Sequence, residues 1–249
     1  MTTAKYLTEL HEQKTALAEN LNALGIGANT NETFNNLVPK VLEIDRYELA
    51  RGLIEGNISD LIIPDGVTSL GKYAFYYDTF TTATIPNSVT SIGYGAFSNC
   101  QKLTSIIIPD SVETLGSYSF MNCKALKSVR ISETITRISD YAFSGCTALA
   151  SVTIPEAVKE IYPYAFDGCS VLTNITIPKG VTSISAYAFW NCKALKTITF
   201  KGTPSKIDSW AFRNCTQADL TIYCPWSEGA VASAPWGATN ATIIYDYEG

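Results

Sequence analysis

The chain has 249 residues, of which 46% are apolar and 16% are charged, so it can bury a sizeable core and lacks the composition of a disordered protein. Its net charge of −5 and pI near 5.0 oppose binding to nucleic acid, which needs basic side chains to neutralise phosphates. No apolar run approaches the roughly 20 residues of a membrane span, and charges interrupt the opening segment MTTAKYLTELHEQKTALAEN, so we expect neither membrane insertion nor a signal peptide.

Residues 1–46 form a first unit without the pattern that fills the rest of the chain. Leucines with helical spacing precede Gly25, and a second amphipathic segment runs from Asn31 to Ile44. We predict a helical hairpin. Two roles stay open for it: a cap over the apolar end of the first repeat, or an attachment segment through which the chain forms homo-oligomers.

Residues 47–217 contain a repeat with a period of 23 residues. Its clearest marker is a phenylalanine that recurs at an interval of 22 residues once and 23 residues five times. These phenylalanines are Phe75, Phe97, Phe120, Phe143, Phe166, Phe189 and Phe212. Other apolar positions keep the same spacing, and the consensus is LxxIxIPxxVxxIxxYAFxxCxx. Such a period predicts a solenoid, in which stacked coils share one core.

Each unit contains three short segments. The I-x-I alternation predicts a strand, which the following proline ends because it lacks an N–H group. The V-x-x-I pair predicts a second extended segment, and A-F-x-x-C predicts a tight helical turn. The expected fold is therefore mainly β with short helical turns, a solenoid of about seven to eight parallel coils with an N-terminal helical hairpin as its cap.

Six of the seven cysteines recur every 23 residues, so stacking places them in one column. They are Cys100, Cys123, Cys146, Cys169, Cys192 and Cys215. A buried cysteine acts as a small apolar residue, and the chain has no C-x-x-C pair to converge on a metal ion. Parallel side chains in a column also disfavour disulfides. We expect free thiols, with no metal and no cofactor.

An aromatic residue also recurs two positions before the phenylalanine, and only Gly95 interrupts this stripe. The candidate binding stripe consists of Tyr73, Tyr118, Tyr141, Tyr164, Tyr187 and Trp210. Two interpretations stay open. The rings could pack on one another and only stabilise the column, or they could form a partly exposed platform for a sugar or a protein partner.

Residues 218–249 depart from the period and are predicted to form a C-terminal cap. Leu220, Ile222 and Cys224 repeat the strand pattern once more, and residues 241–245 are predicted to form a closing strand. Trp226 and Trp236 are large enough to cover the last coil.

No group of residues supports catalysis. The single histidine, His11, has no serine or cysteine nucleophile motif near it, and the nucleotide-binding and calcium-binding motifs are absent from the sequence. We expect no catalytic residues and no enzyme activity. An enzyme acting on carbohydrate is a distant alternative, which a pocket with two close carboxylates would support.

The repeats LTSIIIPDSVETLGSYSFMNC at 103–123 and LTNITIPKGVTSISAYAFWNC at 172–192 resemble the BspA-like class of leucine-rich repeats. The resemblance implies a curved solenoid used for adhesion or recognition, often on bacterial surfaces or in secreted and phage-encoded proteins. The segment HEQKTALAENLNALGIGANTNETFNNLVPKVLEI and the C-terminal tail are similar to segments of prophage tail and baseplate-associated proteins.

The function expected from these patterns is a non-catalytic binding or adhesion module. Its main form is recognition of a host or another surface by a prophage-encoded structural protein, found in the phage particle or the cytoplasm. The alternative is a bacterial adhesin that is secreted or displayed on the cell surface. The expected partner is a protein or glycan on a surface, and not a nucleic acid.

Overall fold

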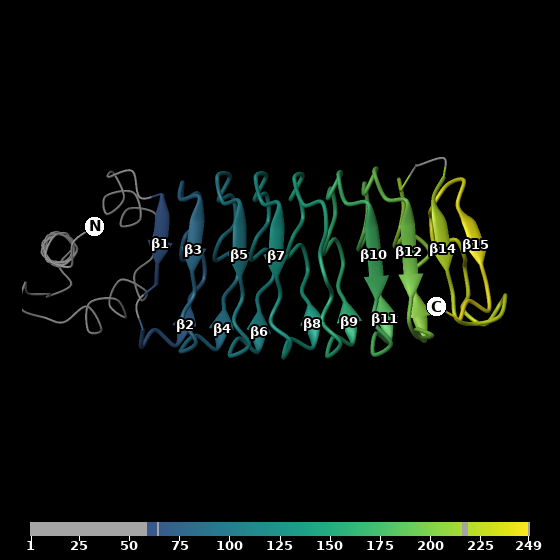
Figure 1. Ribbon diagram of the computed structural model, residues 1–249, viewed down its shortest axis with the longest axis horizontal. Helices are drawn as coiled ribbons and strands as arrows, with labels where there is room; N and C mark the ends of the chain where they lie inside the picture. Colours follow the sequence, from purple (N-terminus) through teal and green to yellow (C-terminus); the bar gives the residue numbers. More distant parts are fainter. Residues whose placement is uncertain (1–58, 64, 216–218, 249) are drawn as a thin grey trace, which may run out of the picture.

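The computed structural model describes residues 59–63, 65–215 and 219–248. Over these residues the chain winds into coils that stack along one axis in sequence order, from β1 to β15 (Figure 1). All strand pairs are parallel and join equivalent residues of successive coils. The described residues contain no helix, and the mainly β solenoid is confirmed. The helical hairpin expected at 1–46 lies outside them.

The strands form two rows along the solenoid, and each row is divided into two sheets. The first row holds β1 (Asp60–Ile62), β3 (Thr82–Thr84), β5 (Ser105–Ile107) and β7 (Ser128–Arg130), then β10 (Asn174–Ile177), β12 (Thr197–Phe200), β14 (Thr221–Tyr223) and β15 (Thr242–Ile244). The second row holds β2 (Ser69–Leu70), β4 (Ser91–Ile92) and β6 (Thr114–Leu115), then β8 (Arg137–Ile138), β9 (Glu160–Ile161), β11 (Ser183–Ile184) and β13 (Lys206–Ile207). The rows correspond to the predicted I-x-I and V-x-x-I segments.

One predicted strand is missing from the first row. Residues 151–155 carry the I-x-I pattern but are not a strand, and this gap separates β7 from β10. The amide of Thr173 lies 3.4 Å from the Ala150 carbonyl, whereas the equivalent bond from Lys196 to Thr173 measures 2.7 Å. The coil is therefore slightly displaced from its neighbour, which weakens the ladder there.

The A-F-x-x-C segment forms successive turns, and the expected tight helical turn is not present. In the coil around Phe120, the amides of Tyr118, Phe120 and Asn122 donate to carbonyls of the next coil at 2.7–2.9 Å. The intervening amides donate three residues back within the same coil at 3.1–3.3 Å. In a helix, every amide would donate within its own coil. Here alternate amides donate to the next coil, so the turns satisfy the backbone groups and also join the coils.

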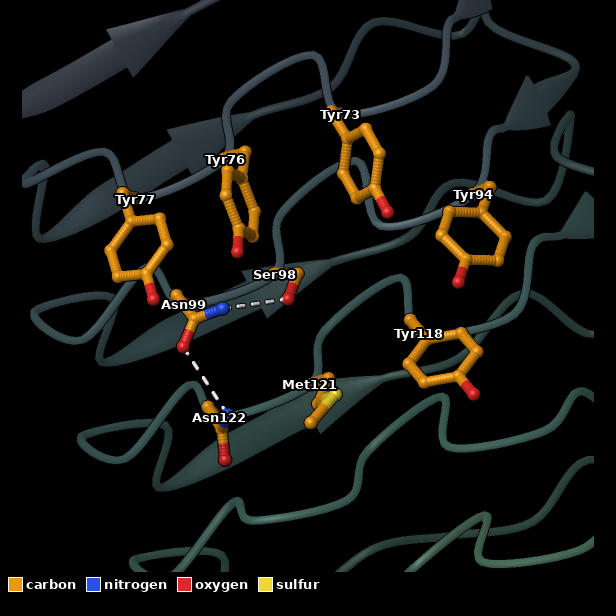
Figure 2. A pocket seen from close by; sticks show the side chains of 9 residues that line it. All are labelled: Tyr73, Tyr76, Tyr77, Tyr94, Ser98, Asn99, Tyr118, Met121 and Asn122. Atoms are coloured by element: carbon orange, nitrogen blue, oxygen red, sulfur yellow. Dashed lines mark hydrogen bonds between the residues drawn. The ribbon is translucent and has the colours of Figure 1, made fainter. Parts of the chain in front are cut away.

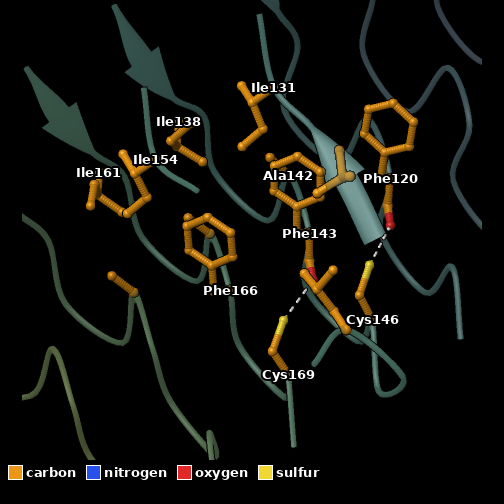
Figure 3. Close-up of a cluster of buried hydrophobic side chains, with 14 of the residues drawn as sticks. Phe120, Ile131, Ile138, Ala142, Phe143, Cys146, Ile154, Ile161, Phe166 and Cys169 are labelled. Carbon is orange, nitrogen blue, oxygen red and sulfur yellow. Dashed lines mark hydrogen bonds between the residues drawn. The ribbon is translucent and has the colours of Figure 1, made fainter. Parts of the chain in front are cut away.

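The core is a set of apolar columns along the axis of the solenoid. The phenylalanines from Phe97 to Phe212 are fully buried, and neighbouring rings lie 5.1–5.5 Å apart with their planes within 11° of parallel. This offset stacking is a favourable geometry for aromatic pairs. Isoleucines and leucines of both strand rows pack against this column (Figure 3).

The cysteine column has a specific backbone contact. The thiols of Cys146 and Cys169 donate to the carbonyl oxygens of Phe120 and Phe143 in the preceding coils, at 3.2 and 3.4 Å (Figure 3). The other four members make the same contact at 2.9–3.3 Å. All seven cysteines are free and buried, which confirms the expected free thiols. Cysteine suits this column position because it is small and its thiol is a weak hydrogen-bond donor.

Asp78 takes the first described position of this column. It precedes Cys100 by 22 residues, the interval that also separates Phe75 from Phe97. Its residue is only 8% exposed, and among the described residues its Oδ2 atom has no hydrogen-bond partner. Burial raises the pKa of this carboxyl to about 7. A carboxylate here is costly because burial removes it from water, and the described residues give its Oδ2 atom no hydrogen-bond partner.

The residues after Cys215 close the described end of the solenoid. Trp236 is fully buried, and its carbonyl accepts a hydrogen bond from the Phe212 amide at 2.9 Å. In the earlier coils, a carbonyl of the next repeat accepts the equivalent bond. The rings of Trp226 and Trp236 lie 5.0 and 5.8 Å from that of Phe200. Strands β14 and β15 occupy the predicted positions. These contacts favour the capping role proposed for 218–249.

The burial of the cysteines predicts that none reacts in the folded protein. Burial raises the pKa of the Cys215 and Cys224 thiols to about 12, and a thiol must ionise and be accessible to react. We expect no thiol to react with Ellman's reagent at neutral pH, and all seven to react after unfolding in guanidinium. A thiol that reacts quickly in the native protein would contradict the buried column.

The buried carboxyl of Asp78 predicts a pH-dependent gain in stability for Asp78→Asn. Its pKa is higher in the folded state than the ordinary value of 3.8, so the unfolded chain ionises first as pH rises. The penalty is absent below about pH 4, grows up to about pH 7 and is constant above it. We expect Asp78→Asn to stabilise the chain by about 2–4 kcal/mol above pH 7 and by almost nothing near pH 4. Thermal unfolding across this range tests it, with exposed Asp65→Asn as the control; equal gains at both pH values would contradict it.

Candidate binding face

The aromatic stripe predicted from the sequence forms a continuous column of rings. The gap at Gly95 is filled by Tyr94, whose ring lies 5.3 Å from that of Tyr73 and 5.0 Å from that of Tyr118. The column consists of Tyr73, Tyr94, Tyr118, Tyr141, Tyr164, Tyr187 and Trp210, with neighbouring centroids 4.6–5.4 Å apart. The structure thus brings together all six predicted residues and adds one.

Five tyrosines of this column have left-handed backbone conformations. They are Tyr73, Tyr118, Tyr141, Tyr164 and Tyr187, with φ between 53° and 61°. Each is the third residue of a four-residue turn, which is closed by a hydrogen bond from the amide of the fourth residue to the carbonyl of the first. A type II turn needs a positive φ at this third position. Glycine or asparagine usually fills it, because a bulky side chain costs about 1 kcal/mol there.

The aromatic column is partly exposed, but its rings differ in what they present to solvent. In the middle, Tyr118, Tyr141, Tyr164 and Tyr187 stack within 15° of parallel, so each ring covers the face of its neighbour. This stretch presents ring edges and hydroxyl groups. Near Tyr94 the planes turn by 87° and 38° relative to the adjacent rings, and the Lys72 ammonium lies 5.2 Å from the centroids of Tyr73 and Tyr94.

Two further rows flank the aromatic column on the turn side of the coils. One follows each core phenylalanine directly and contains Tyr76, Ser98, Met121, Ser144, Asp167, Trp190 and Arg213. The next contains Tyr77, Asn99, Asn122, Gly145, Gly168, Asn191 and Asn214, all with positive φ. We call these three rows together the binding face.

Asparagines of the outer row form hydrogen-bonded pairs between coils. The amide of Asn122 donates to Asn99 Oδ1 at 3.2 Å, and that of Asn214 donates to Asn191 Oδ1 at 3.1 Å. Near the middle, Asp167 accepts hydrogen bonds from Ser144 and Asn191 at 3.2 and 3.4 Å, and partial burial raises its pKa. The polar edge of the face is therefore held in place by its own contacts.

A hollow of about 350 Å³ opens at the β2–β6 end of the binding face (Figure 2). Tyr73, Tyr94 and Tyr118 line one side, and Tyr77, Asn99 and Asn122 line the other. Tyr76, Ser98 and Met121 lie between them. Its volume is at the lower end of the range of small-molecule sites.

The described residues hold no group of three or more histidine, cysteine, aspartate or glutamate side chains that could bind a metal ion. Over the same part of the chain, no helix has the length and apolar character needed to cross a bilayer. His11 lies outside the described residues, as does the segment proposed to form oligomers.

Sequence reasoning missed four aromatic members of the face: Tyr76, Tyr77, Tyr94 and Trp190. Tyr94 could have been found, because it stands directly beside the glycine that interrupts the stripe. Tyr76 and Tyr77 replace residues that are small or polar in most other coils, a departure that the consensus conceals.

The parallel coils, with their inward columns of leucine, isoleucine and phenylalanine, define a leucine-rich repeat solenoid. A family model for the BspA type leucine rich repeat region matches six copies over residues 54–172 and 90–219. The chain belongs to this family. The match does not reach either end of the chain, on which the similarity to prophage tail proteins depended.

Solved structures of other bacterial repeat proteins are similar to this chain. A leucine-rich repeat protein from Eubacterium ventriosum is 34% identical, with a TM-score of 0.59, over 63% of this chain and 42% of that one. A leucine rich cell surface protein from Faecalibacterium prausnitzii is 28% identical, with a TM-score of 0.41, over 59% of this chain and 61% of that one. The chain therefore spans less than two thirds of either protein. No curated protein sequence matches it.

The left-handed tyrosines predict that glycine is tolerated better than alanine at Tyr141. Both substitutions remove stacking contacts of 4.7 and 4.6 Å, at about 0.5–1.5 kcal/mol each, but only alanine keeps the strain of a Cβ atom at φ 53°. We expect Tyr141→Gly to be about 1 kcal/mol more stable than Tyr141→Ala in urea denaturation. At exposed Thr176 in β10, we expect the opposite order, with Thr176→Ala more stable than Thr176→Gly. The same order of stability at both sites would contradict the backbone strain at Tyr141.

Proposed function

We propose that the chain is a non-catalytic recognition module that binds a ligand on a cell surface through its binding face. The observation that supports this most directly is the column of seven half-exposed or exposed aromatic rings, five of them in strained left-handed conformations. Backbone strain of this kind gathers at functional sites. Exposed aromatic side chains with polar neighbours are also typical of binding surfaces.

Backbone strain supports the platform interpretation of the stripe. The neighbouring row meets the same turn requirement mostly with asparagine and glycine, which adopt a positive φ at little cost. The aromatic row meets it with tyrosine and recovers the cost through stacking. Two stacking contacts of about 0.5–1.5 kcal/mol per ring offset the backbone cost of about 1 kcal/mol, and tyrosine adds exposed ring surface beyond this packing.

The finer form of this proposal assigns the module to a prophage-encoded structural protein, attached through residues 1–46. An adhesin that is secreted or displayed on a bacterial cell surface is the alternative. A homo-oligomer that becomes monomeric when residues 1–46 are removed would support attachment. A monomer that aggregates on the same truncation would favour the capping role of that segment.

The proposed function predicts that surface binding depends on the exposed aromatic residues of the binding face. Tyr77, Tyr94 and Trp210 are 54%, 39% and 48% exposed, so alanine at all three should leave the fold intact. We expect the labelled full chain to bind intact bacterial or epithelial cells, and the triple variant to bind at least about tenfold more weakly, because it loses aromatic anchors. Flow cytometry over a concentration series measures this.

A matched control carries alanine at three similarly exposed apolar residues outside the binding face. Ile62, Ile107 and Val171 are 62%, 62% and 42% exposed, and the first two lie on strands β1 and β5. The control variant should bind as the original chain does. Equal losses in the two variants, or no binding of the original chain to any of these cells, would contradict the proposed function.

A further inference from the structure

We infer that the hollow at the β2–β6 end of the binding face is a binding site for one neutral sugar unit of a surface glycan. This inference rests on the proposed function and assigns its ligand class. It follows from the ring faces, the hydrogen-bonding groups and the charge of the residues around the hollow.

The ring stack is interrupted at the hollow because Gly95 stands where other coils carry an aromatic residue. A Cβ atom added to Gly95 would lie 2.6 Å from the Tyr73 ring, so Tyr73 occupies the space that a side chain would need. Tyr94 enters the column from the preceding position, and its ring stands at 87° to that of Tyr73. The Lys72 ammonium lies 5.2 Å from the centroids of both rings, so at this point of the column the rings also contact a cationic side chain.

A second irregularity widens the opening. Ser98 is small and 3% exposed, and it lies in the middle row between Tyr76 and Met121 (Figure 2). The Tyr76 and Tyr77 rings are 4.4 Å apart with an angle of 81° between their planes, so they form a wall at one end. The hollow is therefore bounded by aromatic groups on two sides, with a polar hydroxyl at its base.

Fixed polar groups complete the lining. The Asn99 amide donates to Ser98 Oγ at 3.0 Å, and Asn99 Oδ1 accepts from Asn122 Nδ2 at 3.2 Å. Ser98 acts as the acceptor in the first bond, which leaves its hydroxyl proton and the second amide proton of Asn99 to donate to a ligand. The left-handed backbone at Asn99 and Asn122 holds these groups in position.

The chemistry of the lining matches a pyranose ring. None of the nine lining residues carries a charge at neutral pH. The Lys72 ammonium lies 5.2 Å from the centroids of the Tyr73 and Tyr94 rings, which disfavours a basic ligand. A pyranose has an apolar C–H face that packs on an aromatic ring and hydroxyl groups that accept from amides and hydroxyls. An extended peptide would need a longer groove with unpaired backbone groups along its edge.

Titration of the full chain with neutral disaccharides tests this inference. The probes are cellobiose, maltose, lactose, chitobiose and mannobiose, each followed by saturation-transfer difference NMR and calorimetry. We expect at least one to bind in the millimolar range or tighter. Tyr94→Ala and, separately, Tyr77→Ala should weaken it at least tenfold, or about 1.4 kcal/mol.

The matched control is Ile107→Ala, which removes an exposed apolar side chain on β5, outside the binding face, and should leave sugar binding unchanged. Circular dichroism and thermal unfolding establish that each variant is folded. Absence of binding by all five sugars, or binding that persists in both Tyr94→Ala and Tyr77→Ala, would overturn the inference. A hexapeptide library bound at the hollow in place of the sugars would also overturn it.

The result also separates the two proposals. Loss of cell binding in the triple variant without any disaccharide binding would leave the recognition module intact and remove the sugar assignment. Disaccharide binding that depends on Tyr94, together with no cell binding, would retain the site and contradict the surface role.

Discussion

The hydrogen bonds from each coil to the next are the constraint on which the rest of this structure depends. On the turn side, alternate amides donate to the following coil, while parallel strand pairs serve the other two sides. Because these bonds join the same two positions in each pair of successive coils, a side chain lies over its counterpart one repeat away. A buried phenylalanine therefore meets a phenylalanine, and a thiol meets the carbonyl of the preceding coil.

The same constraint explains how far the sequence could be interpreted. Period and apolar spacing were sufficient to predict the solenoid, both strand rows, the phenylalanine column and the buried free cysteines. The turn geometry was not predictable in the same way, because A-F-x-x-C has the spacing of a helical turn and only the hydrogen bonds between coils favour the alternating pattern. Local propensity and the consensus also failed to show that the coil at 151–155 loses its strand.

For the candidate site, the sequence predicted which residues align but not how their rings are oriented. Tyr141 and Tyr118 differ little in the repeat pattern, and their rings are stacked at 9°. The Tyr73 and Tyr94 rings stand nearly perpendicular, and the Tyr73 ring occupies the space that a Cβ atom on Gly95 would need. Ring orientation determines whether a face or an edge is exposed, so the chemistry of the surface required the structure.

A periodic solenoid presents the same surface at every coil, so a site for one small ligand requires a local departure from the period. Several departures coincide at the β2–β6 end. The interval between Phe75 and Phe97 is one residue short, Asp78 replaces a cysteine, and Gly95 with Tyr94 replaces the regular aromatic residue. Asp78 is buried at a cost in stability, whereas Tyr94 lines the hollow on the surface. The destabilising Asp78 carboxyl and the surface hollow therefore lie in the same coils. This combination fits a binding region, because functional sites commonly depart from the arrangement that is best for stability.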